Sequence, residues 1–295
     1  MTSTTQIAYL NGHYLPLEQA CISTQDRGFL FGDGVYEVIP VYQKQIFELT
    51  AHLQRLKNSL AATHIPNPHS DTEWQTLCQT LVDKHPWPDQ YLYLQITRGI
   101  QTPRDHLPQD NLTPTVYAYS SQLKPLSEHI HNQGISAITL EDIRWQRCDI
   151  KAITLLPNIM MKLAAKQAGA DDAILISKDG YVTEGTASNV FIVKDGTLYT
   201  PPTDHKILPG ITRKVIEAIA KAQQIPLKEQ QIAAEMLTQA DEIWLTSSTK
   251  EALAVTQLNG QKIGKAPYQG QPGPVWHTLR QHYQNYRNQL LNLTN

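Results

Sequence analysis

The sequence is short of cysteine, has no long apolar run and carries no excess of charge of either sign. Its three cysteines, Cys21, Cys78 and Cys148, are far apart and odd in number, which argues against a disulfide framework or a cysteine-rich zinc site. No stretch of about 18 apolar residues offers a transmembrane helix. The polar first residues lack the basic and apolar segments of a signal peptide. We therefore expect a soluble, cytoplasmic protein with reduced thiols.

The charge balance limits the classes of partner. Lys and Arg number 25 and Asp and Glu number 27, so the formal net charge is −2. That balance argues against binding to nucleic acid through phosphate neutralisation and against a polybasic membrane-surface protein. With 41% hydrophobic and 18% charged residues the chain has an ordinary globular mix, and its 295 residues are enough for two domains.

Several common cofactor and catalytic motifs are missing. The segment that begins at Gly32 starts like a dinucleotide-binding loop, but it lacks the third glycine and leads into a strand pattern rather than a helix. There is no Walker lysine pattern, no His-Glu-x-x-His and no Gly-x-Ser-x-Gly. The 11 histidines show no spacing typical of metal ligands, so we expect no metal site.

Apolar spacing predicts a mixture of helices and strands. Helices are expected over the leucine stripe at positions 49–60, after a capping box at 70–73, from Asn158 as the cap to Gly169, and over 210–224. Strands are expected after residue 34 and over 90–96, 115–120 and 135–143. Pro40, within the first of these strands, indicates an edge or a bulge.

Turn signals and irregular stretches predict how these elements are connected. Five Asn-Gly or Asp-Gly dipeptides, beginning at residues 11, 33, 179, 195 and 259, indicate hairpin turns. A polar, proline-containing loop is expected between residues 98 and 114. Residues 122–134 lack clear periodicity and are the predicted linker between an N-terminal domain, 1–121, and a C-terminal domain, 135–295.

Two single residues have both an ordinary and a functional interpretation. Lys151 lies in a strand-like stretch, where a lysine is ordinarily solvated, but a desolvated lysine can also form a Schiff base. Glu184 lies in a turn rich in glycine, serine and asparagine, where a carboxylate held among hydroxyl groups could pair with a protonated pyridine nitrogen.

Three further segments are candidates for anion binding. Residues 208–213 open a predicted helix, whose free N–H groups and Thr212 hydroxyl form an anion site unless they are simply capped. Residues 246–249 carry four hydroxyl groups in a row at a predicted strand end. They form either a simple polar turn or a set of hydrogen-bond donors to a phosphate. Arg104 and His106 could hold a carboxylate or belong to a surface charge cluster. Arg55 projects from the helix face opposite Leu53 and Leu56, so periodicity alone predicts that it is solvent-exposed.

Together these segments resemble the fold-type-IV pyridoxal-phosphate enzymes over nearly the whole chain. The matching segments, in the order of that family, are Asp26-Arg27-Gly28, Phe31-Gly32-Asp33-Gly34-Val35-Tyr36-Glu37, Thr97-Arg98-Gly99, Arg147-Cys148-Asp149-Ile150-Lys151, Thr183-Glu184-Gly185, Ser188-Asn189, Pro209-Gly210-Ile211-Thr212-Arg213 and Thr246-Ser247-Ser248. The resemblance implies an α/β fold of the α+β type, with a small N-terminal α/β sandwich domain and a larger C-terminal pseudo-barrel domain. It is nearest to the bacterial D-amino acid aminotransferases.

The resemblance also implies the cofactor and the residues that hold it. Pyridoxal 5′-phosphate would be bound by Lys151, the catalytic residue, as a Schiff base, and Glu184 would keep the pyridine nitrogen protonated. The phosphate would be held by Arg55, the N–H of Ile211, Thr212 and Ser248. For Arg55 we follow the resemblance over the periodicity, because a phosphate site can lie against a polar helix face.

Two positions depart from the family pattern. Ser248 stands where the family often has threonine, and it keeps the hydroxyl group. Ala187 replaces a hydroxyl residue that is common in the D-amino acid enzymes, which removes one hydrogen bond on the cofactor or substrate side without changing the chemistry.

The resemblance implies substrate residues and a partner as well. Tyr36, Arg104 and His106 would bind the α-carboxylate of the substrate, and the Arg-x-His pair would come from the neighbouring subunit of a homodimer. Branched-chain aminotransferases and aminodeoxychorismate lyases lack that pair in the same place. Because Tyr36 precedes the predicted linker and Lys151 follows it, we expect the site to lie between the domains.

The expected activity is transfer of the amino group of D-alanine and other D-amino acids to 2-oxoglutarate or pyruvate by a ping-pong route. Alternatives within the fold are a branched-chain aminotransferase, an (R)-amine transaminase and an aminodeoxychorismate lyase. An alternative from a different class is a non-catalytic pyridoxal-phosphate binder. The expected partners are therefore small amino and 2-oxo acids and a second copy of the chain.

Overall fold

The computed structural model describes residues 5–292, which form two compact units. The first unit runs to Lys124 and takes in the later segment Ile150–Thr154, and the second comprises Pro125–Asp149 and the residues from Leu155 onward. The predicted linker contains the end of a strand and a short helix, α4 (Glu128–Gln133). The predicted domain boundaries stay a prediction. No helix within residues 5–292 is long and apolar enough to cross a membrane.

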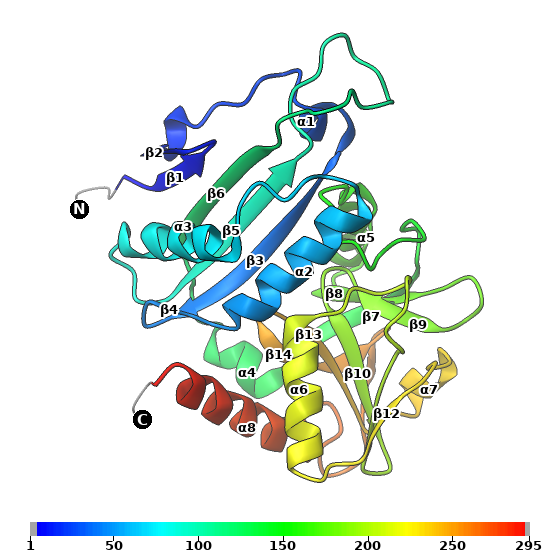
Figure 1. The fold of residues 1–295 in the computed structure, drawn as a ribbon. Coiled ribbons are helices and arrows are strands. Elements are labelled where there is room, and N and C mark those ends of the chain that lie inside the picture. The colour runs from blue at the N-terminus through cyan, green and yellow to red at the C-terminus, as the bar shows by residue number, and fades with distance from the viewer. Residues whose placement is uncertain (1–4, 293–295) are drawn as a thin grey trace. The chain divides into compact units, whose positions relative to one another are not determined.

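The first unit is built on an antiparallel sheet of six strands among its described residues (Figure 1). In spatial order the strands are β2 (His13–Pro16), β1 (Ile7–Leu10), β6 (Thr115–Gln122), β5 (Gln90–Thr97), β3 (Gly34–Tyr42) and β4 (Gln45–Ile46). The prediction that Pro40 marks an edge or a bulge is wrong, because β3 lies between β5 and β4 and keeps an unbroken register with β5. The carbonyl of Pro40 accepts from the N–H of Phe47 at 3.0 Å, so the absent N–H lies on the side away from β5 and does not interrupt the ladder to β5.

Two helices cover one face of this sheet. Helix α2 (Leu49–Ala62) buries the predicted leucine stripe, and helix α3 (Asp71–Asp83) begins at the predicted capping box between Ser70 and Glu73. Helix α2 contacts β3 and helix α3 contacts β5, and both share one hydrophobic core with alternate residues of β5, Leu92, Leu94 and Ile96. The hydrophobic core therefore lies between the helices and the sheet. A shorter helix, α1 (Arg27–Phe31), and a 3₁₀ turn (Leu17–Gln19) precede β3.

The second unit is built on a curled, mixed sheet of nine strands among its described residues. Eight of these strands follow one another in the spatial order β12 (Leu227–Glu229), β11 (Thr197–Thr200), β10 (Asn189–Lys194), β13 (Glu242–Ser247), β14 (Glu251–Leu258), β7 (Ile135–Glu141), β8 (Asp172–Ile176) and β9 (Val182–Gly185). The ninth, β15 (Gln261–Lys262), pairs with β14 outside this order. The sheet curls so far that β9, the last strand, comes back beside β10.

Helices pack against the strands of this sheet. Helices α6 (Ile211–Ala222) and α8 (Pro274–Leu290) contact each other and β13, and α7 (Glu235–Thr238) is a single turn. Helix α5 (Leu156–Gln167) packs on β7 and β8 through Met161 and Ala165. The prediction that Asn158 caps α5 is wrong. The N-cap is Leu155, three residues earlier, with Pro157 in the first turn, and Asn158 donates to the carbonyl of Thr186 instead.

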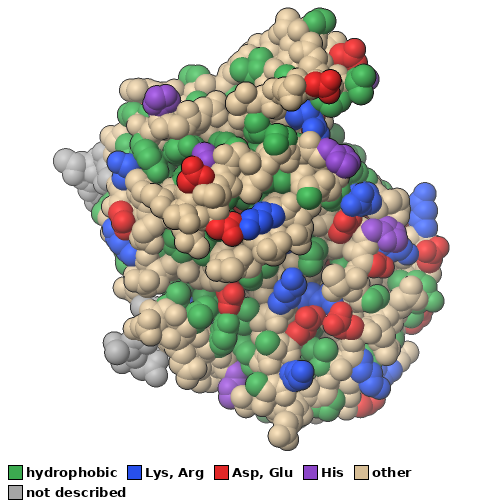
Figure 2. All heavy atoms as spheres, viewed as in Figure 1, with side chains coloured by type: hydrophobic (Ala, Val, Ile, Leu, Met, Phe, Trp, Pro, Cys, Tyr) green, Lys and Arg blue, Asp and Glu red, His purple; other side chains and the backbone are tan. Residues whose placement is uncertain are grey.

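Four of the five predicted turn dipeptides join neighbouring antiparallel strands. They begin at residues 11, 179, 195 and 259 and connect β1–β2, β8–β9, β10–β11 and β14–β15. Asp33-Gly34 is the exception, because it connects the end of α1 to β3 and Asp33 pairs with Arg27 and Arg98. Within each unit, Figure 2 shows acidic and basic side chains interspersed on the visible face, consistent with the balanced composition.

Candidate active site

Lys151 lies in an irregular segment of the first unit rather than in a strand. Its carbonyl accepts from the N–H of Tyr36 at 3.0 Å, and its own N–H donates to the hydroxyl of Ser59 at 3.2 Å. Ala152 adds an isolated bridge to Val35 of β3. These bonds to β3 and α2 fix the backbone of the lysine on both sides, so the position of its amine is set by two elements distant in the sequence.

The predicted pair Lys151 and Tyr36 is brought together. The lysine Nζ lies 4.2 Å from the centroid of the Tyr36 ring, a cation–π distance. Tyr36 in turn stacks on Tyr93 of β5, with ring centroids 5.8 Å apart. The aromatic ring therefore supports and orients the amine at a partly exposed position.

Arg55 is buried, although its position in the leucine periodicity predicts a solvent-facing side chain. It is 6% exposed and makes two parallel bonds to Glu37, from Nε to Oε1 at 2.8 Å and from Nη2 to Oε2 at 2.7 Å. His52 Nδ1 shares Oε2 at 2.8 Å. Burial alone would raise the pKa of Glu37, but Arg55 and His52 outweigh it and hold the pKa at about 2. The periodicity failed because a buried ion pair replaces solvent around the guanidinium.

Arg104 and His106 lie together in the loop between β5 and β6. Both side chains are exposed, and both lie beside the ring of Phe31. The guanidinium carbon of Arg104 is 4.5 Å from the Phe31 ring centroid, and the two ring centroids of Phe31 and His106 are 5.3 Å apart. The loop thus presents a guanidinium and an imidazole on one aromatic support, an arrangement that can bind a carboxylate.

Glu184 is a buried carboxylate at the end of β9 in the second unit. Its Oε1 accepts from Asn189 Nδ2 at 2.9 Å and from the N–H of Leu208 at 3.1 Å, and its Oε2 accepts from Arg144. Burial raises the pKa of Glu184 against the opposing effect of Arg144. Burial thus disfavours the ionised form of Glu184. A positively charged N–H donor bound to the carboxylate would offset this cost and would itself be stabilised.

The start of α6 lies directly beside this carboxylate. Leu208, which binds Glu184, leads into Gly210, the N-cap residue of α6, and no side chain caps the helix. A Cβ on Gly210 would lie 2.0 Å from Oδ1 of Asn189, so only glycine fits there. Ile211 and Thr212 follow as the first buried residues of the helix. The N–H groups of this first turn and the Thr212 hydroxyl are donors of the kind that suits an anion at a helix N-terminus.

The hydroxyl row after β13 is held in the same neighbourhood. Thr246 pairs in register with Asn189 of β10, and Ser248 follows two residues later. The hydroxyl groups of Thr246 and Ser188 are buried and lack a hydrogen-bond partner within residues 5–292. A buried carboxylate, an uncapped helix start and orphaned hydroxyl groups suit a cofactor that carries both a phosphate and a protonated ring nitrogen.

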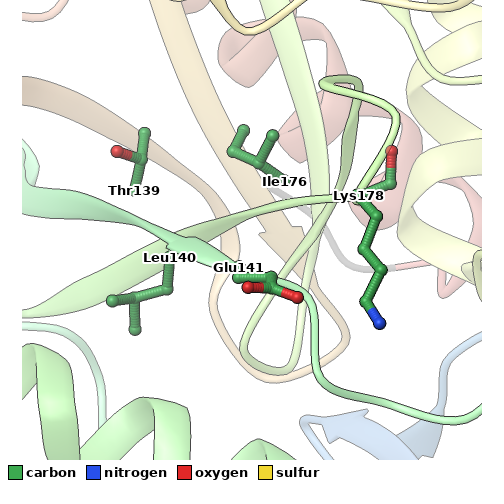
Figure 3. A pocket seen from close by; sticks show the side chains of 6 residues that line it. Thr139, Leu140, Glu141, Ile176 and Lys178 are labelled. Carbon is green, nitrogen blue, oxygen red and sulfur yellow. The ribbon is translucent and has the colours of Figure 1, made fainter.

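A separate surface pocket of about 430 Å³ lies in the second unit. Its walls are formed by β7, β8 and the turn after β8, with the exposed side chains of Glu141 and Lys178 among them (Figure 3). None of the predicted site residues lines this pocket. We therefore assign it no part in the chemistry. Within the described residues no cluster of three or more metal-ligating side chains occurs.

Sequence reasoning missed the residues that hold the predicted ones in place. Arg144 bridges Glu184 and Asp142, and its bond to Asp142 is 2.7 Å. Arg27 and Glu37 occur in the sequence only as parts of motifs. No local periodicity identifies such residues, because each acts through a partner many positions away. For Arg27 and Glu37 the available signal is their position inside segments that resemble the family, whereas Arg144 lies outside those segments.

Comparison with known proteins places these features in context. Residues 34–258 match the family described as amino-transferase class IV. The chain is similar to a D-alanine aminotransferase of Bacillus licheniformis, with 41% identity over 93% of this chain and 95% of the relative. A D-alanine aminotransferase of Staphylococcus aureus is 36% identical over 94% of this chain and 96% of the relative.

Solved structures with the same fold are similar over almost the whole chain. The branched-chain amino acid aminotransferase of Escherichia coli has a TM-score of 0.91 and 26% identity, covering 99% of this chain and 96% of its own. A second branched-chain aminotransferase, solved with pyridoxamine 5′-phosphate, has a TM-score of 0.89 and 26% identity, covering 98% and 95%. The expected fold class is therefore confirmed.

Proposed function

We propose that this chain, which belongs to the class IV aminotransferases, transfers the amino group of D-alanine and other D-amino acids to 2-oxoglutarate or pyruvate. The observation that carries the donor assignment is the similarity, at 36–41% identity over at least 93% of the chain, to proteins named D-alanine aminotransferase. Enzymes of this family use pyridoxal 5′-phosphate, which serves as an electron sink at the substrate Cα during the reaction.

Residues of both units contribute to this proposal. Lys151 would hold the cofactor through its amine and, once the amino group of the donor has displaced that amine, would move a proton at the donor Cα, with the Tyr36 ring orienting the amine. Glu184 would bind the ring N–H, because burial of its carboxylate favours a cationic donor there. The phosphate-binding groups are Arg55, the N–H of Ile211, and the hydroxyl groups of Thr212 and Ser248.

Arg104 and His106 are the proposed substrate residues, together with Tyr36. A guanidinium can hold a carboxylate through two parallel N–H···O bonds, which fixes the orientation of the donor and hence the face of Cα that meets Lys151. We propose that this pair is supplied by the second subunit of a homodimer. A cytoplasmic location is also part of the proposal, and cell fractionation tests it.

A second candidate is a branched-chain aminotransferase. The observation in its favour is the similarity to solved structures of that name, at 25–26% identity. D-alanine remains the preferred donor because the relatives named for it are more similar in sequence. The Arg-x-His pair, which the family resemblance assigns to D-amino acid enzymes, supports the same choice.

A donor panel separates these candidates. Purified enzyme with pyridoxal 5′-phosphate is given D-alanine, L-alanine, D-leucine, L-leucine or (R)-1-phenylethylamine, each with 2-oxoglutarate, and product glutamate is resolved by chirality. We expect D-alanine to react and to yield D-glutamate. L-leucine as the best donor, with L-glutamate formed, would identify the branched-chain activity instead. Bound cofactor with no transamination of any donor would identify a non-catalytic binder.

The blank for this panel is Lys151→Ala. Lys151 is partly exposed and holds its neighbours through backbone groups, so the variant should fold while losing turnover completely. Circular dichroism and thermal unfolding check the fold. Normal activity in Lys151→Ala would contradict the assigned role of the lysine.

A further inference from the structure

The segment from Asp26 to Asp33 contains no residue with a role in the proposed chemistry, yet it makes many of the polar contacts to the loop between β5 and β6. It begins at Asp26, which caps α1 by accepting from the N–H of Gly28 at 2.8 Å and also accepts from the Thr97 hydroxyl at 3.0 Å. Asp26 is also bridged to Ile100, at the start of that loop. The segment is therefore attached to the base of the loop that carries Arg104 and His106.

Arg27 extends this attachment to the tip of the loop. Arg27 is 4% exposed, and all of its guanidinium nitrogens are engaged. Nη1 donates to the carbonyl of Asp105 at 2.7 Å, and Nη2 donates to the carbonyl of His106 at 2.8 Å. Two consecutive carbonyl groups are thus held by one rigid, planar cation, which fixes the path of the chain immediately after Arg104.

Two further bonds hold Arg27 itself in place. Nε donates to Asp33 at 2.8 Å, and Nη1 also donates to the side-chain oxygen of Gln101 at 3.1 Å. Arg98 binds the same Asp33 carboxylate, with Nε at 2.8 Å. Burial opposes ionisation of Asp33, but the two arginines outweigh it and lower its pKa. The anchor therefore stays charged and keeps the orientation of Arg27 fixed near neutral pH.

Phe31 supports the side chains that the loop presents. Its ring centroid lies 4.5 Å from the guanidinium carbon of Arg104, 4.9 Å from that of Arg27 and 5.3 Å from the His106 ring centroid. Stacking on a ring face restricts a guanidinium but leaves the N–H groups at its edge available. No hydrogen bond or ion pair within residues 5–292 occupies the Arg104 guanidinium. The Phe31 ring thus holds the Arg104 guanidinium in place while leaving its positive charge available to a substrate carboxylate.

We propose that Arg27 and Phe31 are positioning residues that set specificity for a carboxylate-bearing donor, by preorganising Arg104 and His106. This rests on the roles proposed above for Arg104 and His106. Arg27 fixes the backbone of the loop, and Phe31 fixes the two side chains. The α-carboxylate binds more tightly because the loop is already ordered before the substrate arrives, so binding does not have to order it.

The central test replaces the Phe31 ring by an apolar side chain in Phe31→Leu. The Michaelis constant for D-alanine and the inhibition constant of propionate, a carboxylate without the amino group, should both rise by about tenfold. The kcat should stay within about twofold, because Phe31 does not touch the reacting atoms. Cofactor absorbance should not change. The matched control is Phe29→Leu, on the same helix with a ring that is 66% exposed, which should behave like the wild type.

A second arm replaces Arg27 by lysine. Arg27→Lys keeps the charge but cannot hold two carbonyl groups and Asp33 at once, so the same two constants should rise with kcat little changed. A fall in kcat and thermal stability with both constants unchanged, in Arg27→Lys or Phe31→Leu, would overturn the inference, because a merely structural role predicts that pattern.

Combination with Arg104→Ala distinguishes this inference from the proposed function. Arg104→Ala alone should raise both constants by at least about tenfold, and adding Phe31→Leu should raise them no further. Independent, additive effects would overturn the positioning role while leaving Arg104 as the carboxylate ligand. Unchanged constants in Arg104→Ala would overturn the carboxylate role proposed for Arg104, and the inference with it.

Discussion

At the scale of the residue, the buried cluster of Glu37, His52 and Arg55 ties stability to the ionisation of one carboxylate. Glu37 is fully buried, yet it stays ionised because Arg55 binds both of its oxygens and His52 binds one of them. Removing one partner would leave a buried charge uncompensated, which is costly in proteins. The same bonds hold the Arg55 guanidinium in a fixed plane, which suits the phosphate-binding role proposed for it.

The cluster predicts a specific acid sensitivity. The pKa of Glu37 falls from its ordinary 4.5 to about 2 on folding, so its contribution to stability is complete above pH 4.5 and is lost as the pH falls toward 2. Between pH 6 and pH 3 the wild type should lose about 2 kcal/mol more unfolding free energy than Glu37→Gln. Urea unfolding at a series of pH values measures this difference.

The control for this measurement is Glu235→Gln, in the exposed first turn of α7. It should follow the pH dependence of the wild type. A parallel pH dependence in the wild type and Glu37→Gln would show that Glu37 does not ionise at a low pH in the folded state, and the buried ion pair would then be wrong.

At the scale of the element, the start of helix α6 is the arrangement most dependent on one residue. Gly210 precedes the helix, and Asn189 fills the space where a side chain would lie. Asn189 also connects Glu184 to the carbonyl of Leu208 through two bonds of 2.9 Å. The carboxylate and the helix start are therefore held by one amide, so a displacement at either is transmitted to the other.

Gly210→Ala should weaken cofactor binding. The added Cβ would come within 2.0 Å of Asn189 Oδ1, and relieving that overlap costs about 1–3 kcal/mol by shifting the amide or the helix start. Titration of the apoenzyme with pyridoxal 5′-phosphate, followed by absorbance, measures the loss. The opposite exchange at the exposed end of the same helix, Ala222→Gly, should leave the affinity unchanged. Wild-type affinity in Gly210→Ala would show that the helix start is not part of the cofactor site.

At the scale of the whole molecule, the proposed homodimer determines whether a single chain is competent. Arg104 and His106 lie on an exposed loop of the first unit, and the family resemblance assigns them to the neighbouring subunit's site. A symmetric dimer would then contain two sites, each made from both chains. That arrangement makes activity depend on assembly, which a monomeric enzyme would not show.

Subunit mixing tests the shared site. Lys151→Ala and Arg104→Ala are each expected to be poorly active at low D-alanine concentration. After reversible dissociation of an equal mixture, roughly a quarter of wild-type activity should return, because half of the dimers are mixed and each of these has one intact site. The control pairs Lys151→Ala with Glu184→Gln, two residues assigned to the same site from one chain, and should not recover. Equal recovery in both mixtures, or in neither, would contradict the shared site.

The sequence predicted much of the local structure and most of the candidate residues. The structure contains the predicted leucine stripe of α2 and the predicted capping box of α3. Four of the five Asn-Gly or Asp-Gly dipeptides form the hairpin turns that local patterns predict. Local patterns failed at Arg55 and Asn158. Arg55 is buried by an ion pair with a residue on another element, and Asn158 bonds to Thr186 rather than to its own helix start.

The sequence by itself determined the family, the secondary structure of the longest elements and the residue types needed for the chemistry. These follow from short-range periodicity, from capping and turn preferences, and from ordered motifs. Only the tertiary structure decided which charges are buried together and which backbone is held by which side chain. Glu37 with Arg55, Glu184 with Arg144, and Arg27 with the loop at His106 are such pairs. Their partners are 18–79 positions apart, and only packing brings such distant groups within hydrogen-bonding distance.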